Sequence, residues 1–425
     1  MQKYLFLRTF LLVFSAIPPI AFGNNPATGP DWSVPVDYQK ALELARANDP
    51  RFALLESRIE AAEGRIEQAD NRPNPVIGAE VENFIGSGPF SGVDGVEITL
   101  GVRQVIETAG KRERRTALAR SQRGALDWQR ELLTARIEAE VQEALAAVIL
   151  ARDAVELRGQ QVELAREGLE ETGRQVEAAR TSGVELTRAR LALRQQEFAQ
   201  AQASRELEAA RTALASLWGL SPAPDFSVAG RVELEPELPR LEELLAVLPR
   251  TAALRRFEAE RETRAAALEL EQARSSPDLE LFGGGRYFNE GDGEAAFVMG
   301  VELPWTLFNK NAGNIRSARA RLRGVDHEQA AAERDLTVRL SAAWRTLSSA
   351  HADVRALEQD LLPAAEQTLA ETEAGYQRGQ FTLLSVLDSR QALFGIREAW
   401  LESMNRYASA LAEVRALTRP AGINR

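Results

Sequence analysis

Cysteine is absent from the 425-residue chain, which has only two histidines and three methionines. Without cysteine the chain has no disulfide, no thiolate zinc site and no lipid on an amino-terminal cysteine. The histidines, His327 and His351, both fall on predicted helices and form no ligand cluster for a transition metal. We therefore expect no metal site and no cofactor, and we interpret both histidines as ordinary helix-surface residues.

Signatures of catalysis and of nucleic-acid binding are also missing. The 52 basic residues are mixed with 62 acidic ones, for a net charge of -10, whereas a nucleic-acid interface needs clustered, uncompensated positive charge. The sequence contains no serine–histidine–acid set and no phosphate-binding loop, and "FGGGRYF" (282–288) lacks the helix that a dinucleotide fingerprint requires. We expect neither an enzyme nor a nucleic-acid-binding protein.

Long apolar runs are confined to residues 1–23. Lys3 and Arg8 precede an apolar run at 9–14, and small residues follow, a pattern typical of a secretory signal peptide cleaved near Asn24. We therefore expect the mature chain to leave the cytoplasm. Beyond this segment no uninterrupted apolar stretch reaches the roughly 18 residues of a spanning helix, so the sequence predicts no transmembrane helix.

Similar segments recur in the two halves of the chain. "ARANDPRFALLES" (45–57) is echoed by "LAVLPRTAALRRF" (245–257), and "ARTSGVELTRARL" (179–191) by "YQRGQFTLLSVLD" (376–388). Between the halves, residues 220–240 are proline-rich without a helical period, which is typical of a linker. We interpret the chain as a tandem duplication of one unit. Its parts are a first repeat at 24–219, the linker at 220–240, a second repeat at 241–418 and a tail at 419–425.

Each repeat is predicted to contain a first helix, a β-hairpin, a very long helix, a tight turn and another long helix. The helix periods and the glycine-rich turns give the boundaries. The predicted hairpins span 75–105 and 277–305, and the predicted long helices span 112–178, 184–217, 312–376 and 382–417.

The long helices carry apolar residues every seven positions, which is typical of left-handed supercoiled helices. Helix 112–178 carries two such stripes on nearly opposite sides, so we expect a neighbouring helix on each side, as in a ring of helices. The first stripe contains Val141, Val148, Val155, Val162, Leu169 and Val176, and the second Leu150, Leu157 and Leu164. Helices alone would also suit a fibrous rod or scaffold.

The predicted strands alternate strictly between apolar and polar residues. In one strand Ile98, Leu100 and Val102 point to one face, whereas Thr99 and Arg103 point to the other. Strands of about ten residues suit a tilted crossing of a bilayer, with apolar residues toward lipid and polar residues lining a lumen. A lumen lining also explains glutamates on one strand face more simply than acid–base catalysis does.

A membrane sheet must close on itself, because open edges in hydrocarbon leave backbone groups unsatisfied. Four strands are too few for a single-chain barrel, so this interpretation requires an oligomer. Aromatic residues at both strand ends suit the membrane–water interfaces. They are Phe84, Tyr287 and Phe288 near the loops, and Trp305 and Phe308 at the opposite end. The basic cluster at Lys111, Arg112, Arg114 and Arg115 either attracts lipid headgroups or is simply solvated.

The motifs "ANDPRF", "RPNPVIGAEVENF", "TLGVRQVIETAGKRERR" and "GYQRGQFTLLSVLDSRQAL" resemble those of the TolC-type outer-membrane efflux channels, especially the branch that serves cobalt-zinc-cadmium pumps. The resemblance covers essentially the whole mature chain, in order. It implies a mainly α fold with a membrane β region, in which a homotrimer forms a twelve-stranded barrel in the outer-membrane lipid and a long periplasmic helical tunnel. It also implies two partners, a periplasmic adaptor and a proton-driven inner-membrane pump of the RND type, and a metal cation as exported solute.

The same resemblance carries roles for residues near the helix turns. Tyr376 matches an aperture tyrosine, and Asp388 matches one of two acidic positions that ring the periplasmic entrance. Ser385 stands at the other acidic position and Phe381 where the family has an arginine. The expected adaptor-docking tips contain Ser182, Gly183, Arg378 and Gly379, and we expect the glycines there to provide the positive φ that a helix reversal needs.

Two other classes of protein remain possible from sequence. A periplasmic coiled-coil adaptor would also have helical hairpins, but it would have one hairpin flanked by small β domains, which the duplication contradicts. A coiled-coil scaffold would leave the alternating strands unexplained.

Overall fold

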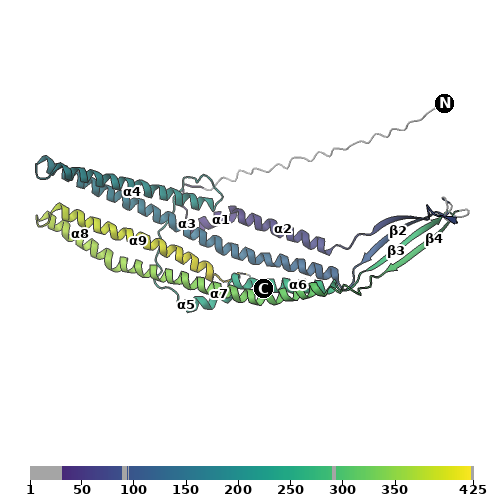
Figure 1. The fold of residues 1–425 in the computed structure, drawn as a ribbon. Helices are drawn as coiled ribbons and strands as arrows, with labels where there is room; N and C mark the ends of the chain where they lie inside the picture. Colours follow the sequence, from purple (N-terminus) through teal and green to yellow (C-terminus); the bar gives the residue numbers. More distant parts are fainter. Residues whose placement is uncertain (1–30, 89–92, 94, 290–292, 423–425) are drawn as a thin grey trace, which may run out of the picture.

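The chain forms a long bundle of helices with a small sheet at one end (Figure 1). The computed structural model describes residues 31–88, 93, 95–289 and 293–422, so the predicted signal segment at 1–23 lies outside the described residues. In order, the main elements are α1 (Tyr38–Asn48), α2 (Pro50–Asp70), β1 (Val76–Glu82), β2 (Glu97–Ile106), α3 (Lys111–Glu177), α4 (Gly183–Ser216), α5 (Leu241–Val247), α6 (Ala252–Ala273), β3 (Leu279–Phe288), β4 (Glu294–Glu302), α7 (Ala312–Ala356), α8 (Leu362–Gln377) and α9 (Leu383–Thr418).

The helices form a wall that is four helices wide at each height. Near the sheet, α3 packs between α2 and α6, and α6 packs on α7. Farther from the sheet, α3 packs between α4 and α9, and α9 packs on α8 (Figure 1). We call this far end, with turns at 178–182 and 378–382, the turn end. Only α3 runs the whole length, and its 67 residues span about 100 Å at 1.5 Å per residue.

Opposite faces of α3 are buried against different helices, as the two apolar stripes predict. Val141 and Val148 lie in a core with Leu214 of α4, whereas Leu157 and Leu164 pack on Phe394 of α9. Each side chain is at most 9% exposed. Burial of this size contributes about 1.5 to 3 kcal/mol per large apolar side chain. The double stripe therefore fixes α3 between two neighbours.

The long helix that we predict over 312–376 is interrupted. A π-helical turn at Leu357–Leu361 separates α7 from α8, and Pro363 follows at the start of α8. Proline has no backbone N–H and its ring crowds the preceding turn, so a regular ladder of hydrogen bonds cannot pass through it. The sequence prediction of one continuous helix is wrong here because it overlooked Pro363.

His351 is a buried residue and not the helix-surface residue that we expect from sequence. Its side chain lies on α7, is 8% exposed, and its Nε2 is 2.8 Å from the carbonyl oxygen of Glu235 in the 220–240 segment. The amide of Glu235 donates to the Tyr407 hydroxyl of α9 at 2.9 Å. These two bonds hold the connecting segment against α7 and α9, which explains why the imidazole is buried.

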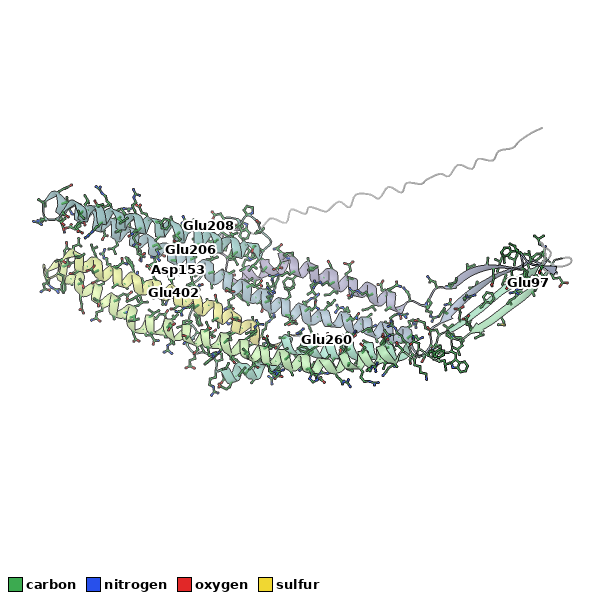
Figure 2. The ribbon with its side chains drawn as sticks, in the orientation of Figure 1. Glu97, Asp153, Glu206, Glu208, Glu260 and Glu402 are labelled. Carbon is green, nitrogen blue, oxygen red and sulfur yellow. The ribbon has the colours of Figure 1, made fainter. Side chains whose placement is uncertain are left out.

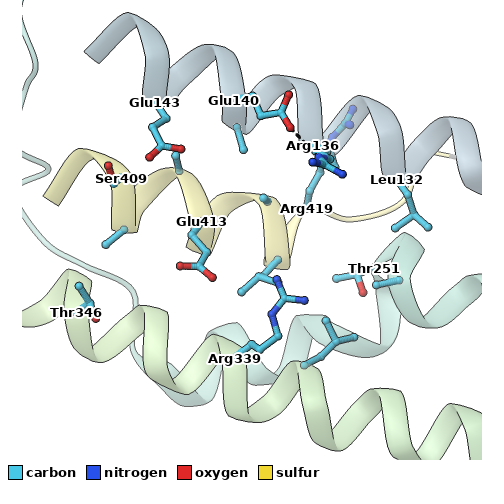
Figure 3. Close-up of a pocket in the computed structure, with 18 of the residues that line it drawn as sticks. Leu132, Arg136, Glu140, Glu143, Thr251, Arg339, Thr346, Ser409, Glu413 and Arg419 are labelled. Carbon is cyan, nitrogen blue, oxygen red and sulfur yellow. Dashed lines mark hydrogen bonds and ion pairs between the residues drawn. The ribbon is translucent and has the colours of Figure 1, made fainter. Parts of the chain in front are cut away.

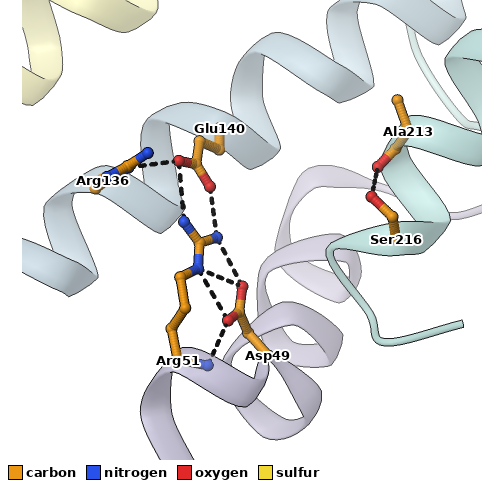
Figure 4. A network of polar contacts seen from close by, with 6 residues as sticks. All are labelled: Asp49, Arg51, Arg136, Glu140, Ala213 and Ser216. Atoms are coloured by element: carbon orange, nitrogen blue, oxygen red, sulfur yellow. Dashed lines mark hydrogen bonds and ion pairs between the residues drawn. The ribbon is translucent and has the colours of Figure 1, made fainter. Parts of the chain in front are cut away.

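A charged network fastens the start of α2 to the middle of α3 (Figure 4). The Asp49 carboxylate accepts the Arg51 amide at 2.8 Å and caps α2. The Arg51 guanidinium donates to Asp49 at 2.7 Å and to Glu140 at 2.5 Å, and Arg136 reaches Glu140 at 2.7 Å. Burial alone would raise the pKa of Asp49, but the bonds from Arg51 outweigh it and lower the pKa. Arg51 and Arg136 likewise outweigh burial and lower the pKa of Glu140.

Among the helices in the part of the chain that the structure describes, none combines the length and apolar content that a bilayer crossing requires.

We predict that Arg51→Gln lowers stability at neutral pH by about 1 to 3 kcal/mol, because two carboxylates lose charged hydrogen bonds. Lowered acid pKa values stabilise the fold above the ordinary carboxyl range of about 4, and this stabilisation disappears as the pH falls through the folded pKa values. Thermal unfolding of wild type and variant should therefore differ less in acid.

Arg136→Gln is the control, because this side chain is 72% exposed and contacts Glu140 alone. Equal losses in both variants, or a difference that is independent of pH, would contradict the prediction.

Candidate functional site

The sheet has the order β1-β2-β3-β4 with every pair antiparallel. Its register brings most of the apolar residues of the four strands onto one face. Several of them have almost no neighbours in the described chain: Ile77 is 83%, Met299 87% and Phe297 100% exposed. This apolar face consists of Ile77, Ala79, Val81, Ile98, Leu100, Val102, Leu281, Tyr287, Ala295, Phe297, Met299 and Val301.

The opposite face of the sheet is polar and internally paired. Arg286 donates to Glu97 at 2.8 Å and to the hydroxyl of Thr99 at 2.9 Å, and its guanidinium lies 2.9 Å from Glu82. Figure 2 places Glu97 at the loop end of the sheet, away from the helices. The network buries Thr99, which is 3% exposed. We call this surface the polar face.

The outer strands β1 and β4 each have one neighbour within the described sheet. Their free edges carry backbone N–H and C=O groups that a further strand can pair with. A bare apolar face together with two free edges is not a stable end state for an isolated chain in water. The sheet therefore needs a cover for its apolar face and partners for its two free edges.

Aromatic side chains lie exposed at both ends of the sheet. Phe84 is 57% and Tyr287 43% exposed near the loops, whereas Trp305 is 89% and Phe308 96% exposed at the helix end. Phe288 is partly buried, because it lies on the polar face, beside Glu97 and Glu294. Of the five predicted interface aromatics, Phe288 thus lies on the face opposite to that of Tyr287.

The basic cluster that follows β2 is fully paired with acids. Lys111 is 9% exposed and lies 2.6 Å from Asp278, the residue that precedes β3. Asp278 also accepts the amide of Thr108 at 2.9 Å. The remaining arginines of the cluster pair with acids as well: Arg112 with Asp70, Arg114 with Glu269 and Arg115 with Glu107. Lys111 and Arg115 therefore join the start of α3 to the segments that flank the strands, whereas Arg112 and Arg114 pair with acids of α2 and α6.

At the turn end, the two helix reversals have the same geometry. Ala179 has φ 54° and Gly379 has φ 75°, and each amide bonds back to the carbonyl three residues earlier. Ser182 and Thr382 follow at matching places, directly before α4 and α9. Arg378 lies in the second turn and bonds Gln380 at 3.2 Å.

The positive φ predicted for Gly183 is wrong, because this residue is the first of α4 and has no positive φ. The residue equivalent to Gly379 is Ala179. It could not be predicted from sequence, because alanine rarely adopts the left-handed conformation. The two repeats therefore correspond with a shift of 200 residues here, from Ala179 to Gly379.

The predicted aperture residues lie on α8 and α9 beside this turn. Tyr376 is 44% exposed, and Ser385 bonds Thr382 through its hydroxyl at 3.1 Å. Asp388 is exposed and has neither a hydrogen bond nor an ion pair with another described residue of the chain. Its carboxylate is therefore exposed to solvent beside the turn. Phe381, in place of the expected arginine, packs its ring against the buried Gly375.

Two arginines that sequence inspection missed connect three helices near the turn end. Arg390 of α9 lies 2.7 Å from Glu167 of α3 and 2.9 Å from Glu373 of α8. Arg397, seven residues later, lies 3.2 Å from Gln160 of α3 and 3.5 Å from Glu366 of α8. The seven-residue spacing of the two arginines places them on one face of α9, and this spacing could have indicated a shared role.

A cavity of about 790 Å³ lies at mid-length between α3, α6, α7 and α9 (Figure 3). Its lining carries both signs of charge, with Glu140, Glu143 and Glu413 among Arg136, Arg339 and Arg419. It occupies the place where α9 ends and α6 begins. Within the described residues, no group of three or more histidine, aspartate or glutamate side chains could hold a metal ion. We interpret this cavity as a packing gap at the junction of these helices.

Comparison with known proteins agrees with this architecture. The model of the family "Outer membrane efflux protein" matches residues 41–220 and 246–418. The chain is 30% identical over 387 residues to the cobalt-zinc-cadmium resistance protein CzcC of Cupriavidus metallidurans, covering 91% of this chain and 90% of that protein.

Solved structures with the same fold include a membrane protein from Pseudomonas aeruginosa, with a TM-score of 0.72 at 18% identity, covering 89% of this chain and 90% of that one. Another is CusC, with a TM-score of 0.69 at 17% identity, covering 89% and 91%. The chain belongs to the outer membrane efflux protein family, and its fold is that of the TolC-like outer-membrane channels.

We predict opposite effects of alanine at the two turn-end glycines. Gly379→Ala should destabilise the chain by about 1 to 2 kcal/mol, because alanine at φ 75° is strained. Gly183→Ala should be neutral or stabilising by up to about 1 kcal/mol, because the residue is helical and its Cβ meets nothing within 4 Å. Thermal loss of helical circular dichroism measures both. Equal destabilisation by the two substitutions would contradict this assignment of the turns.

Proposed function

We propose that the chain is the outer-membrane exit channel of a tripartite, proton-driven efflux system and that it conducts heavy-metal cations out of the periplasm. The observation that carries this proposal is the sheet, with its bare apolar face, its paired polar face and its two free edges. Three chains, each with four strands, give twelve strands, enough to close a barrel whose polar face lines a lumen.

The wall of helices supports the same assembly. Each chain is four helices wide at both heights, with α4 and α2 at one border and α8 and α7 at the other. A heptad-spaced row of exposed apolar residues on the border helix α4, Val184, Leu191 and Phe198, needs a partner of this kind. We infer that three chains form a continuous tunnel in the periplasm, and that the halves 24–219 and 241–418 are repeats of one unit.

Two observations support a metal cation as the exported solute, namely the similarity to CzcC and the negative charge of the polar face. The relative CzcC is named a cobalt-zinc-cadmium resistance protein. Around the loop end of the polar face stand Glu80, Glu82, Glu97 and Glu294, with Arg286 paired among them. This excess of negative charge concentrates cations at the exit of the lumen.

The turn end is the proposed periplasmic entrance. Three copies of Asp388, with Tyr376 and Ser385 nearby, would ring the aperture, and the tips at Ser182, Gly183, Arg378 and Gly379 would receive a periplasmic adaptor. The adaptor would connect the tunnel to an inner-membrane pump of the RND type, which supplies both the energy and the choice of solute.

The direct test of the proposal is single-channel recording of the detergent-extracted protein in a planar bilayer. Discrete conductance steps with a preference for cations are the expected result. A water-soluble protein that never inserts into the bilayer would contradict the proposal and favour a periplasmic scaffold or adaptor.

We predict that Asp388→Asn weakens block of the open channel by a trivalent cation added on the periplasmic side, because the substitution removes three negative charges from one ring. Glu402→Gln is the matched control. Glu402 lies on the same face of α9, two heptads away, and is also exposed. Its substitution should leave the block at the aperture nearly unchanged. Unaltered block in Asp388→Asn would remove this residue from the entrance.

A further inference from the structure

The middle of the polar face has a floor of glycine. Gly78, Gly101 and Gly284 lie side by side on β1, β2 and β3, in one row of the register. The next polar-face row contains Phe282, between Arg103 of β2 and Gly300 of β4. Phe282 is thus a large aromatic side chain at the middle of the polar face, where Val298 of β4 completes the glycine row and Phe288 lies farther toward the loops.

The Phe282 ring lies close over Gly101. A methyl group built on Gly101 would be 2.7 Å from the ring Cζ and closer still to Cε2, so only a residue without Cβ fits beneath the ring. On the other flank, a methyl group on Gly300 would be 3.9 Å from the ring, which is ordinary contact. By contrast, a methyl group on Gly78 would meet nothing within 4 Å.

One charged neighbour, Arg103 of β2, contacts the ring. The Arg103 guanidinium lies 5.8 Å from the ring centroid, within the range of a cation–π contact. Arg103 is itself paired with Glu280 at 3.0 Å. The ring therefore has an apolar glycine surface below it and a fixed cation beside it.

We propose that Gly101 is a positioning residue for the channel bore, because it gives the Phe282 ring a recess in the wall and keeps three such rings out of the lumen at mid-barrel. This inference rests on the proposed function, since it requires the polar face to line a lumen. With the recess filled, the ring cannot stay over Gly101, and the directions open to it include the flank at Gly300 and the bore.

The test compares two double variants that add the same two methyl groups to the polar face. Gly101→Ala/Gly300→Ala fills the recess and the opposite flank, and Gly78→Ala/Gly300→Ala is the matched control. We expect the first variant to lose single-channel conductance relative to the second, because its rings narrow the lumen. Adding Phe282→Ala to the first variant should restore the conductance.

Two further comparisons keep the result interpretable. Only protein that is extracted from the outer membrane with the oligomeric mass of wild type is recorded. Phe282→Ala alone leaves the glycine floor intact and should change the conductance little, because the ring already lies against the wall.

Three results would overturn the inference: equal conductance of the two double variants, a loss that Phe282→Ala does not restore, or a large rise in conductance for Phe282→Ala alone. Absence of any channel in wild type would instead contradict the proposed function itself. The two failures are therefore distinguishable.

Discussion

The rest of the structure depends on one constraint, which is that backbone N–H and C=O groups cannot be left unpaired in hydrocarbon. The chain has four described strands with an apolar face, and the outer two, β1 and β4, have free edges. Each unsatisfied group would cost several kcal/mol in lipid, far more than any side-chain contact of the sheet returns. The proposed channel meets this constraint because copies of the chain complete one another's edges, and three chains of four strands give a barrel of twelve.

The helices extend the same arrangement away from the lipid. Helix α3 has buried stripes on both sides, so it cannot end a row and must stand within one. Charged groups then fix the joints, with Lys111 and Asp278 between the sheet and the helices and Arg51 between α2 and α3. Near the turn end, Arg390 connects three helices that must stay together or separate if the entrance is to change its width. Apolar stripes thus set the order of the wall, and ion pairs hold its ends in register.

Periodic features could be predicted from the sequence, because the spacing of side chains alone determines which face of an element they occupy. The two stripes of α3 and the apolar face of the sheet are of this kind. Features that occur at a single place in the chain could not be predicted in this way. The π-helical turn before Pro363, the left-handed Ala179 and the burial of His351 against the Glu235 carbonyl each depend on contacts between segments distant in sequence or on one local conformation.

The candidate site was predictable to a similar degree. The strand faces and the aromatic ends follow from alternation, with Phe288 as the exception. The roles of the turn residues come from the family resemblance. Glycine content suggests Gly183 as the counterpart of Gly379, whereas the structure shows that the equivalent residue is Ala179. Glycine marks a possible positive φ but does not prove one, because it is also tolerated at a helix start.

The most direct test of this account is disulfide cross-linking between the free edges of the sheet. The chain has no cysteine, so one cysteine introduced on β1 and one on β4 are the only residues that can form disulfides. Scanning β4 positions against Ala79→Cys of β1 in outer-membrane fractions should find a register that traps covalent oligomers, which a non-reducing gel separates. The account predicts a ladder that stops at three chains, because the barrel is then closed. A ladder that continues beyond three chains, or no cross-link at any register, would contradict it.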